Sequence, residues 1–141
     1  MKQNKIGAIL VTGGGGFIGS HSTIELLRLG YRVVVIDNFS NCKKDIVKRI
    51  KKISKKNIPF YNCDIRNTRK VISIIKKNKI ATVLHFAALK SVEESIINQK
   101  LYYENNVVGT FKLLNAVAKM NVKKVIFSSS ATVYDSRNKP P

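Results

Sequence analysis

The sequence predicts an α/β fold, in which helices cover both faces of a doubly wound parallel sheet. Short apolar runs alternate with segments of helical periodicity from Ile6 to Ser128, and a glycine cluster separates the first run from the first helical segment. Alternation of this kind gives parallel strands joined by right-handed helical crossovers, with strand order 3-2-1-4-5. A chain of 141 residues is one domain by length.

The five apolar runs are expected to be strands because each is short and is bounded by polar or turn residues. They are Ile6–Thr12, Arg32–Asp37, Pro59–Cys63, Thr82–Phe86 and Lys124–Ser128. Ligands of such sheets bind at the carboxyl ends of the strands. The loops after Thr12, Asp37, Cys63, Phe86 and Ser128 should therefore surround one crevice.

The segments between the runs are expected to be helices. Phe17–Leu29 has apolar periodicity and is stopped by Gly30, and Lys43–Lys55 and Thr68–Lys77 follow the second and third strands. A longer helical pattern runs from about Ser91 to Met120, with one apolar stripe at Val107, Phe111, Leu114 and Val117, next to Ala118.

Composition excludes several function classes. The net charge of +18 invites a nucleic-acid interpretation, but the lysines are spread over the whole chain. Where they crowd, at 43–56, Ile46, Ile50 and Ile53 form a helical stripe, so the lysines fit a solvent-facing side. No aromatic stacking platform accompanies them, and we expect no nucleic-acid partner.

No apolar run reaches the roughly 20 residues of a membrane span, so we expect no membrane partner and a cytoplasmic location. Cys42 and Cys63 have neither metal-ligand spacing nor a CxxC pattern. We expect reduced thiols and no metal site.

The glycine cluster predicts a binding site for an anionic cofactor. Gly13, Gly16 and Gly19 are spaced three apart between the first strand and the first helix. Such glycines permit a tight turn, close approach of backbone to a pyrophosphate, and close helix–strand packing. Asp37 ends the second strand 18 residues beyond Gly19, where a carboxylate can bind a ribose 2′-hydroxyl. An acid there favours NAD over NADP, because it repels a 2′-phosphate.

Five blocks of sequence carry a family resemblance, at residues 12–21, 64–67, 85–95, 102–110 and 127–134. On these blocks the chain resembles the extended short-chain dehydrogenase/reductase superfamily and, within it, the UDP-glucose 4-epimerases. A related 4,6-dehydratase would carry acids where Ala131 and Thr132 stand. The resemblance implies a Rossmann-type NAD-binding domain over residues 1–141, incomplete, with the catalytic helix and the sugar-binding domain of the family not included. In this family the chains form homodimers through helices that here would include residues 91–120.

The resemblance also implies roles for individual residues. Phe17 and Ile18 would lie against the pyrophosphate turn, and Ser130 would hydrogen-bond the reacting sugar hydroxyl, with Thr132 beside it. The remaining cofactor contacts would come from three loops and one helix: Asp37, Asn38, Phe39, Ser40, Asn41 and Cys42 at the adenosine ribose; Asp64 and Ile65 at the adenine; Phe86, Ala87, Ala88, Leu89 and Lys90 along the nicotinamide side; and Asn105 from its helix. Taken singly, Ile65 and Phe86 fit a plain core position equally well, and Lys90 and Asn105 fit surface positions.

The implied reaction interconverts UDP-galactose and UDP-glucose through a 4-keto intermediate, with NAD accepting and returning a hydride at C4. The family's base is a Tyr four residues before a Lys, and none of the five tyrosines here has that spacing. The sequence therefore looks like an N-terminal fragment, for which we expect little or no turnover. Another nucleotide-sugar epimerase or dehydratase, and a non-catalytic dinucleotide-binding module, are the alternatives.

Overall fold

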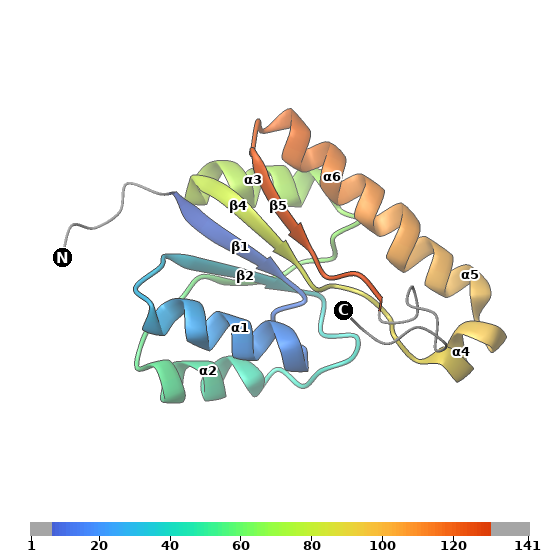
Figure 1. Cartoon of the computed structure of the whole chain (residues 1–141), viewed down its shortest axis with the longest axis horizontal. Coiled ribbons are helices and arrows are strands. Elements are labelled where there is room, and N and C mark those ends of the chain that lie inside the picture. Colours follow the sequence, from blue (N-terminus) through green and yellow to red (C-terminus); the bar gives the residue numbers. More distant parts are fainter. Residues whose placement is uncertain (1–6, 131–141) are drawn as a thin grey trace, which may run out of the picture.

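The computed structural model describes residues 7–130, which form a parallel sheet between two helical layers (Figure 1). The strands are β1 (Ala8–Thr12), β2 (Val33–Asp37), β3 (Phe60–Asn62), β4 (Ile80–His85) and β5 (Lys124–Phe127). Their order is β3-β2-β1-β4-β5 and every pair is parallel, so the predicted fold class and strand order are confirmed.

The helices α1 (Phe17–Arg28) and α2 (Ile46–Ser54) cover one face of the sheet, and α3 (Thr68–Asn78) and α6 (Gly109–Lys119) cover the other. The alternation of side chains along β1 explains both layers. Ile9 and Val11 belong to one core cluster with Leu27 of α1 and Ile50 of α2. Ala8 and Leu10 belong to the other, with the apolar side chains of α3 and α6. A central strand buried on both faces needs apolar residues at successive positions, and β1 supplies them.

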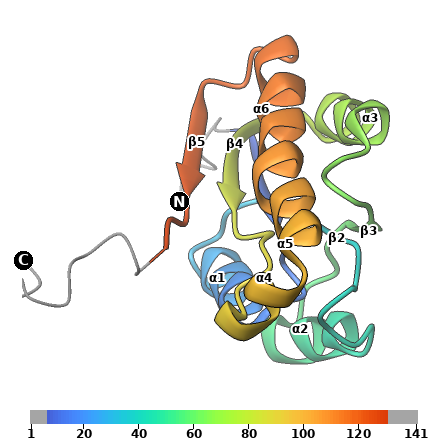
Figure 2. The ribbon, with the colours of Figure 1, turned by 90° about the vertical axis from the view of Figure 1, so that its right-hand side faces the viewer.

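The long helical pattern after β4 is interrupted once. A short helix, α4 (Val92–Ile97), ends before Asn98, and a continuous rod then follows (Figure 2). This rod consists of α5 (Gln99–Tyr102), the π-helical segment η1 (Tyr103–Val108) and α6. No helix within residues 7–130 is long and apolar enough to cross a membrane.

The expected apolar stripe of this rod does not form the buried face. Leu113, Ala116 and Val117 of α6 are buried, whereas Phe111 is 63% exposed and Val107 and Leu114 are half exposed. The rod carries apolar residues on two faces, and only one of them meets the sheet. The likewise predicted stripe of α2 is buried at Ile50, but Ile53 is 54% exposed.

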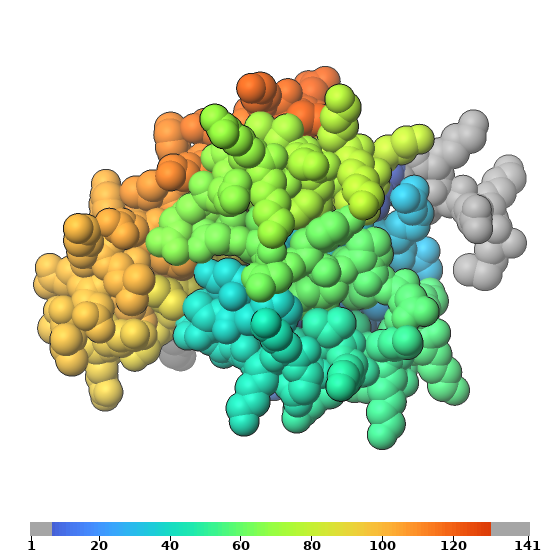
Figure 3. Space-filling model, turned by 180° about the vertical axis from the view of Figure 1, so that it is seen from behind, coloured from blue at the N-terminus to red at the C-terminus, as the bar shows by residue number. Residues whose placement is uncertain are grey.

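The surface seen from behind is formed mainly by α3 and the segment around α2 (Figure 3). Lys56, which follows α2, reaches across to α1, where its Nζ donates a hydrogen bond to the carbonyl oxygen of Leu27 at 2.6 Å. The same oxygen accepts the Gly30 N–H at 3.1 Å, so the cation adds a second donor at the C-terminus of the helix.

Candidate functional site

A cleft of about 970 Å³ opens at the carboxyl edge of the sheet. Its walls are the turn after β1, the loop after β2, the segment after β4, the rod and the residues after β5. Of the residues that the sequence analysis assigns to the cofactor, all except Phe39 and Asp64 line this cleft. A cleft of this size matches the range of small-molecule and cofactor sites.

The turn after β1 depends on glycine at two positions. Gly13 has φ +67°, and a Cβ on it would lie 2.6 Å from the backbone nitrogen of Ala87. A Cβ on Gly19 would collide with the Gly13 carbonyl and lie 2.8 Å from the Cα of Gly14. The turn is therefore packed against the segment after β4 on one side and against α1 on the other.

The N-terminus of α1 faces the cleft without a capping side chain. Gly16 is the N-cap residue, and it provides no side-chain capping hydrogen bond to the first N–H groups of the helix. The first N–H groups of a helix have no intrahelical partner and carry partial positive charge. Gly16, Phe17, Ile18 and Gly19 all line the cleft, so this end of α1 suits an anion such as a pyrophosphate.

Asp37 joins two walls of the cleft. Its Oδ2 accepts a hydrogen bond from the backbone N–H of Gly15 at 2.9 Å, and its Oδ1 accepts one from the N–H of Phe39 at 2.7 Å. The Cys42 thiol donates to Oδ1 at 3.6 Å. Burial, together with the Asp37 charge, raises the pKa of the Cys42 thiol to about 11, so this thiol stays protonated. The carboxylate is thus fixed beside the glycine turn before any ligand arrives.

Asp64 and Phe39 lie behind the cleft wall rather than on it. Asp64 accepts hydrogen bonds from Nε and Nη2 of Arg66 at 3.0 and 2.7 Å, and one from Nδ2 of Asn38 at 3.2 Å. These bonds to Arg66 hold the pKa of the Asp64 carboxyl down at about 2. Phe39 stacks on Phe60, with ring centroids 5.4 Å apart. Asp64 therefore supports Asn38, which does line the cleft.

His85 ends β4 and links three elements. Its Nδ1 is 2.7 Å from the Thr12 hydroxyl of β1, and its Nε2 is 2.9 Å from the Thr110 hydroxyl of α6. The ring also contacts Phe127, with centroids 5.5 Å apart. Burial lowers the pKa of His85 to about 4, so the imidazole is neutral at physiological pH. In the neutral ring one nitrogen donates a hydrogen bond and the other accepts one, so both can bond to the hydroxyls of Thr12 and Thr110.

The remaining predicted residues lie at the far side of the cleft. Lys90 is an exposed residue of the segment after β4, and Asn105 lies on the rod, where its Nδ2 donates to the Oδ1 of Asn106 at 2.9 Å. Ser130 lines the cleft beyond β5. Thr132 lies outside the described residues.

Sequence reasoning missed several residues of the lining, among them His85, Tyr102, Asn106 and Thr110. His85 stands at a strand end, which was a usable signal. The other three lie on the rod, within the block 102–110 that carries the family resemblance, but no spacing rule indicates their partners, which are 11 to 25 residues away.

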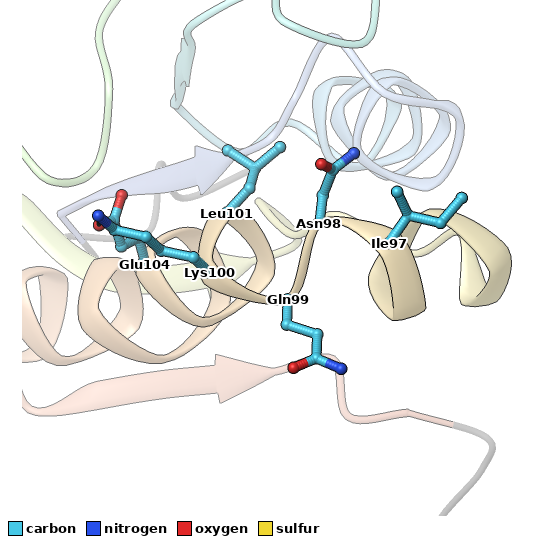
Figure 4. Close-up of a pocket in the computed structure, with 6 residues that line it drawn as sticks. All are labelled: Ile97, Asn98, Gln99, Lys100, Leu101 and Glu104. Carbon is cyan, nitrogen blue, oxygen red and sulfur yellow. Dashed lines mark ion pairs between the residues drawn. The ribbon is translucent and has the colours of Figure 1, made fainter.

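A second hollow, of about 450 Å³, lies at the junction of α4 and α5 (Figure 4). It is lined by one short stretch of chain, in which Asn98 and Leu101 project to one side and Gln99 to the other. Its one ion pair is the exposed contact between Lys100 and Glu104 at 3.9 Å. None of the predicted site residues lies there, so the larger cleft is the candidate functional site.

Comparison with known proteins gives the family. The family model of GDP-mannose 4,6 dehydratase matches residues 10–141. A UDP-glucose 4-epimerase of Bacillus subtilis is 50% identical over 127 residues, which are 90% of this chain and 38% of that protein. A UDP-glucose 4-epimerase of Klebsiella pneumoniae is 46% identical over 133 residues, which are 94% of this chain and 96% of that protein.

Solved structures agree with this assignment. A UDP-glucose 4-epimerase of Stenotrophomonas maltophila, with bound NAD and formylated UDP-arabinopyranose, superposes with a TM-score of 0.92 at 40% identity, over 96% of this chain and 40% of that one. An epimerase of Bifidobacterium longum in complex with NAD+ and UDP gives a TM-score of 0.90 at 43% identity, over 95% of this chain and 40% of that one. The chain spans about two fifths of most of the curated relatives described as UDP-glucose 4-epimerases. It belongs to the family that the GDP-mannose 4,6 dehydratase model describes, and within that family it is a homologue of the N-terminal part of the UDP-glucose 4-epimerases.

Proposed function

We propose that this chain is the NAD-binding part of an isomerase that interconverts UDP-galactose and UDP-glucose. One observation carries the proposal. The glycine turn, the Asp37 loop and the Phe86–Lys90 segment, which the sequence assigned to one cofactor, line a single cleft at the carboxyl edge of the sheet. The related structures with bound NAD support it.

The residues of the cleft fit the parts of NAD in order. The uncapped N-terminus of α1 supplies backbone N–H groups for the pyrophosphate. The Asp37 carboxylate accepts hydrogen bonds from the adenosine ribose, and Asn38, Ser40, Asn41 and Cys42 border it. The Phe86–Lys90 segment and Asn105 form the nicotinamide side, which brings the Lys90 cation near the cofactor.

Bound NAD supplies hydride transfer at C4 of the sugar. Ser130 would hydrogen-bond the reacting hydroxyl, and Thr132, the other expected substrate residue, lies outside the described residues. The Tyr-x-x-x-Lys pair that provides the base in this family does not occur among the 141 residues. Without a base of matched pKa, proton removal from the C4 hydroxyl is slow.

A second candidate function is a dinucleotide-binding module without turnover, because the lining of the cleft by itself accounts for cofactor binding only. Isothermal titration of NAD+ into the purified, folded chain tests the cofactor site, and a coupled assay with UDP-galactose tests the reaction. Binding with little or no turnover is the expected result. The absence of NAD+ binding by a folded sample would contradict the proposal, and rapid turnover would show that another group acts as the base.

A further inference from the structure

Three side chains of the rod are bonded to the chain segment that leaves β4. They are spaced four residues apart along the rod, and their partners run in the reverse direction along the segment. The pairs are Tyr102 with Ser91, Asn106 with Leu89, and Thr110 with His85. All six residues line the cleft. The cleft wall of residues 85–91 is therefore attached to the rod along its length.

Asn106 makes the central pair with both ends of its amide. Its Oδ1 accepts a hydrogen bond from the N–H of Leu89 at 2.9 Å, and its Nδ2 donates to the carbonyl oxygen of Leu89 at 2.9 Å. The side chain thus takes the place of a neighbouring strand, which would satisfy the same two groups. Asn105 donates to the same Oδ1 at 2.9 Å, which fixes the orientation of the Asn106 amide.

Two adjacent asparagines, Asn105 and Asn106, line the cleft from the π-helical segment Tyr103–Val108. The hydrogen bond from Asn105 Nδ2 to Asn106 Oδ1 joins their two amides at this wall. Such segments occur frequently at functional sites.

We propose that Asn106 is a positioning residue, which holds the Leu89 peptide so that the Phe86–Lys90 wall has the shape that receives the nicotinamide half of the cofactor. This inference rests on the proposed function for the identity of the ligand. Asn106 acts through the backbone of Leu89, and Asn105, which also lines the cleft, donates to the Asn106 amide.

The variant Asn106→Asp tests this role. A carboxylate still accepts from the Leu89 N–H, but it has no proton to donate to the Leu89 carbonyl oxygen. We expect the affinity for NAD+ to fall about tenfold, because the variant loses one part-buried hydrogen bond and places a carboxylate against the Leu89 carbonyl oxygen. The affinity for ADP, which lacks the nicotinamide half, should change less than twofold. The matched control is Asn115→Asp, on the exposed side of α6, which should bind both ligands like the unmodified chain.

A second measurement does not depend on the cofactor. Hydrogen exchange at the Leu89 amide should be faster in Asn106→Ala, which removes the acceptor of this N–H, than in Asn115→Ala on the exposed side of α6. Unchanged exchange, unchanged NAD+ affinity, or an equal loss of NAD+ and ADP affinity would each overturn the positioning role. If the unmodified chain binds no NAD+, the proposed function fails, and exchange at Leu89 still decides whether Asn106 holds this wall.

Discussion

The carboxylate of Asp37 accepts a hydrogen bond from the backbone N–H of Gly15 at 2.9 Å, so the acid that ends β2 is attached to the turn that follows β1. The same carboxylate also receives the N–H of Phe39. Two walls of the cleft therefore share one side chain, and changes at this residue should affect both the fold of the turn and the binding of a ribose.

Replacing Asp37 with Ala should weaken NAD+ binding by at least about tenfold, because the ribose loses a charged acceptor. It should also lower the free energy of unfolding by about 1–3 kcal/mol, because two backbone N–H groups lose their partner. Calorimetric titration and urea unfolding measure the two effects. Asp45→Ala removes only an exposed ion pair with Arg49 and is the control. Equal behaviour of the two variants would contradict the role of Asp37.

Replacing Gly19 with Ala should destabilise the chain by about 3 kcal/mol, because the new Cβ has to displace the backbone of the glycine turn. Gly30→Ala is the comparison. Its φ is +85°, but nothing lies within 4 Å of an added Cβ, so only the left-handed strain of about 1–2 kcal/mol applies. Thermal unfolding followed by circular dichroism orders the two variants. A larger loss at Gly30 would show that packing of α1 on the turn is loose.

His85 should make stability depend on pH in a defined window. Its pKa in the fold is about 4, below the ordinary value of 6.5, so the unfolded chain binds the proton more tightly. The contribution is present in full above pH 6.5, and it is lost as the pH falls from 6.5 through 4. The total loss is about 3 kcal/mol.

The variant His85→Gln removes this titration while keeping a side chain that can donate and accept. Urea unfolding between pH 4 and 7 should therefore show a smaller slope for His85→Gln than for the unmodified chain. Identical slopes would mean that other groups cause the acid sensitivity.

Replacing Lys56 with Met should cost about 1 kcal/mol, because the Leu27 carbonyl oxygen at the end of α1 loses its charged donor and keeps only the Gly30 N–H. The methionine keeps the apolar stem of the lysine, so the change isolates the hydrogen bond. Lys52→Met, at an exposed position of α2, is the matched control and should be close to neutral. Chemical denaturation gives both values, and the idea fails if the two variants are equally stable.

The fold could be predicted from the sequence because each strand is a short apolar run and the helices between them have clear periodicity. The positions of the strand ends then predicted most of the residues that line the cleft, because parallel strands bring their carboxyl ends to one edge of the sheet. The glycine turn was predictable because Gly13 and Gly19 have no room for a Cβ. Asp37 was predictable because it ends the second strand 18 residues beyond Gly19.

The wall after β4 was less predictable. The chain is rich in asparagine, so Asn106 does not stand out in the sequence. Its role depends on the backbone N–H and carbonyl oxygen of Leu89, 17 residues away. Periodicity could not decide which face of α6 meets the sheet, because apolar residues occur on two faces. The sequence likewise could not show that Phe39 stacks on Phe60 and does not line the cleft, whereas Asn38 and Ser40 do.

The cleft draws its lining from elements on both sides of β1, with α1 and the Asp37 loop on one side and the rod on the other. A ligand in the cleft would contact elements of both helical layers and stabilise their arrangement on the sheet. The unfolding temperature should therefore rise with ligand concentration. At a ligand concentration one hundred times the dissociation constant, binding adds about 2.7 kcal/mol to the free energy of unfolding. The temperature of unfolding then reports occupancy of the cleft without any catalytic readout.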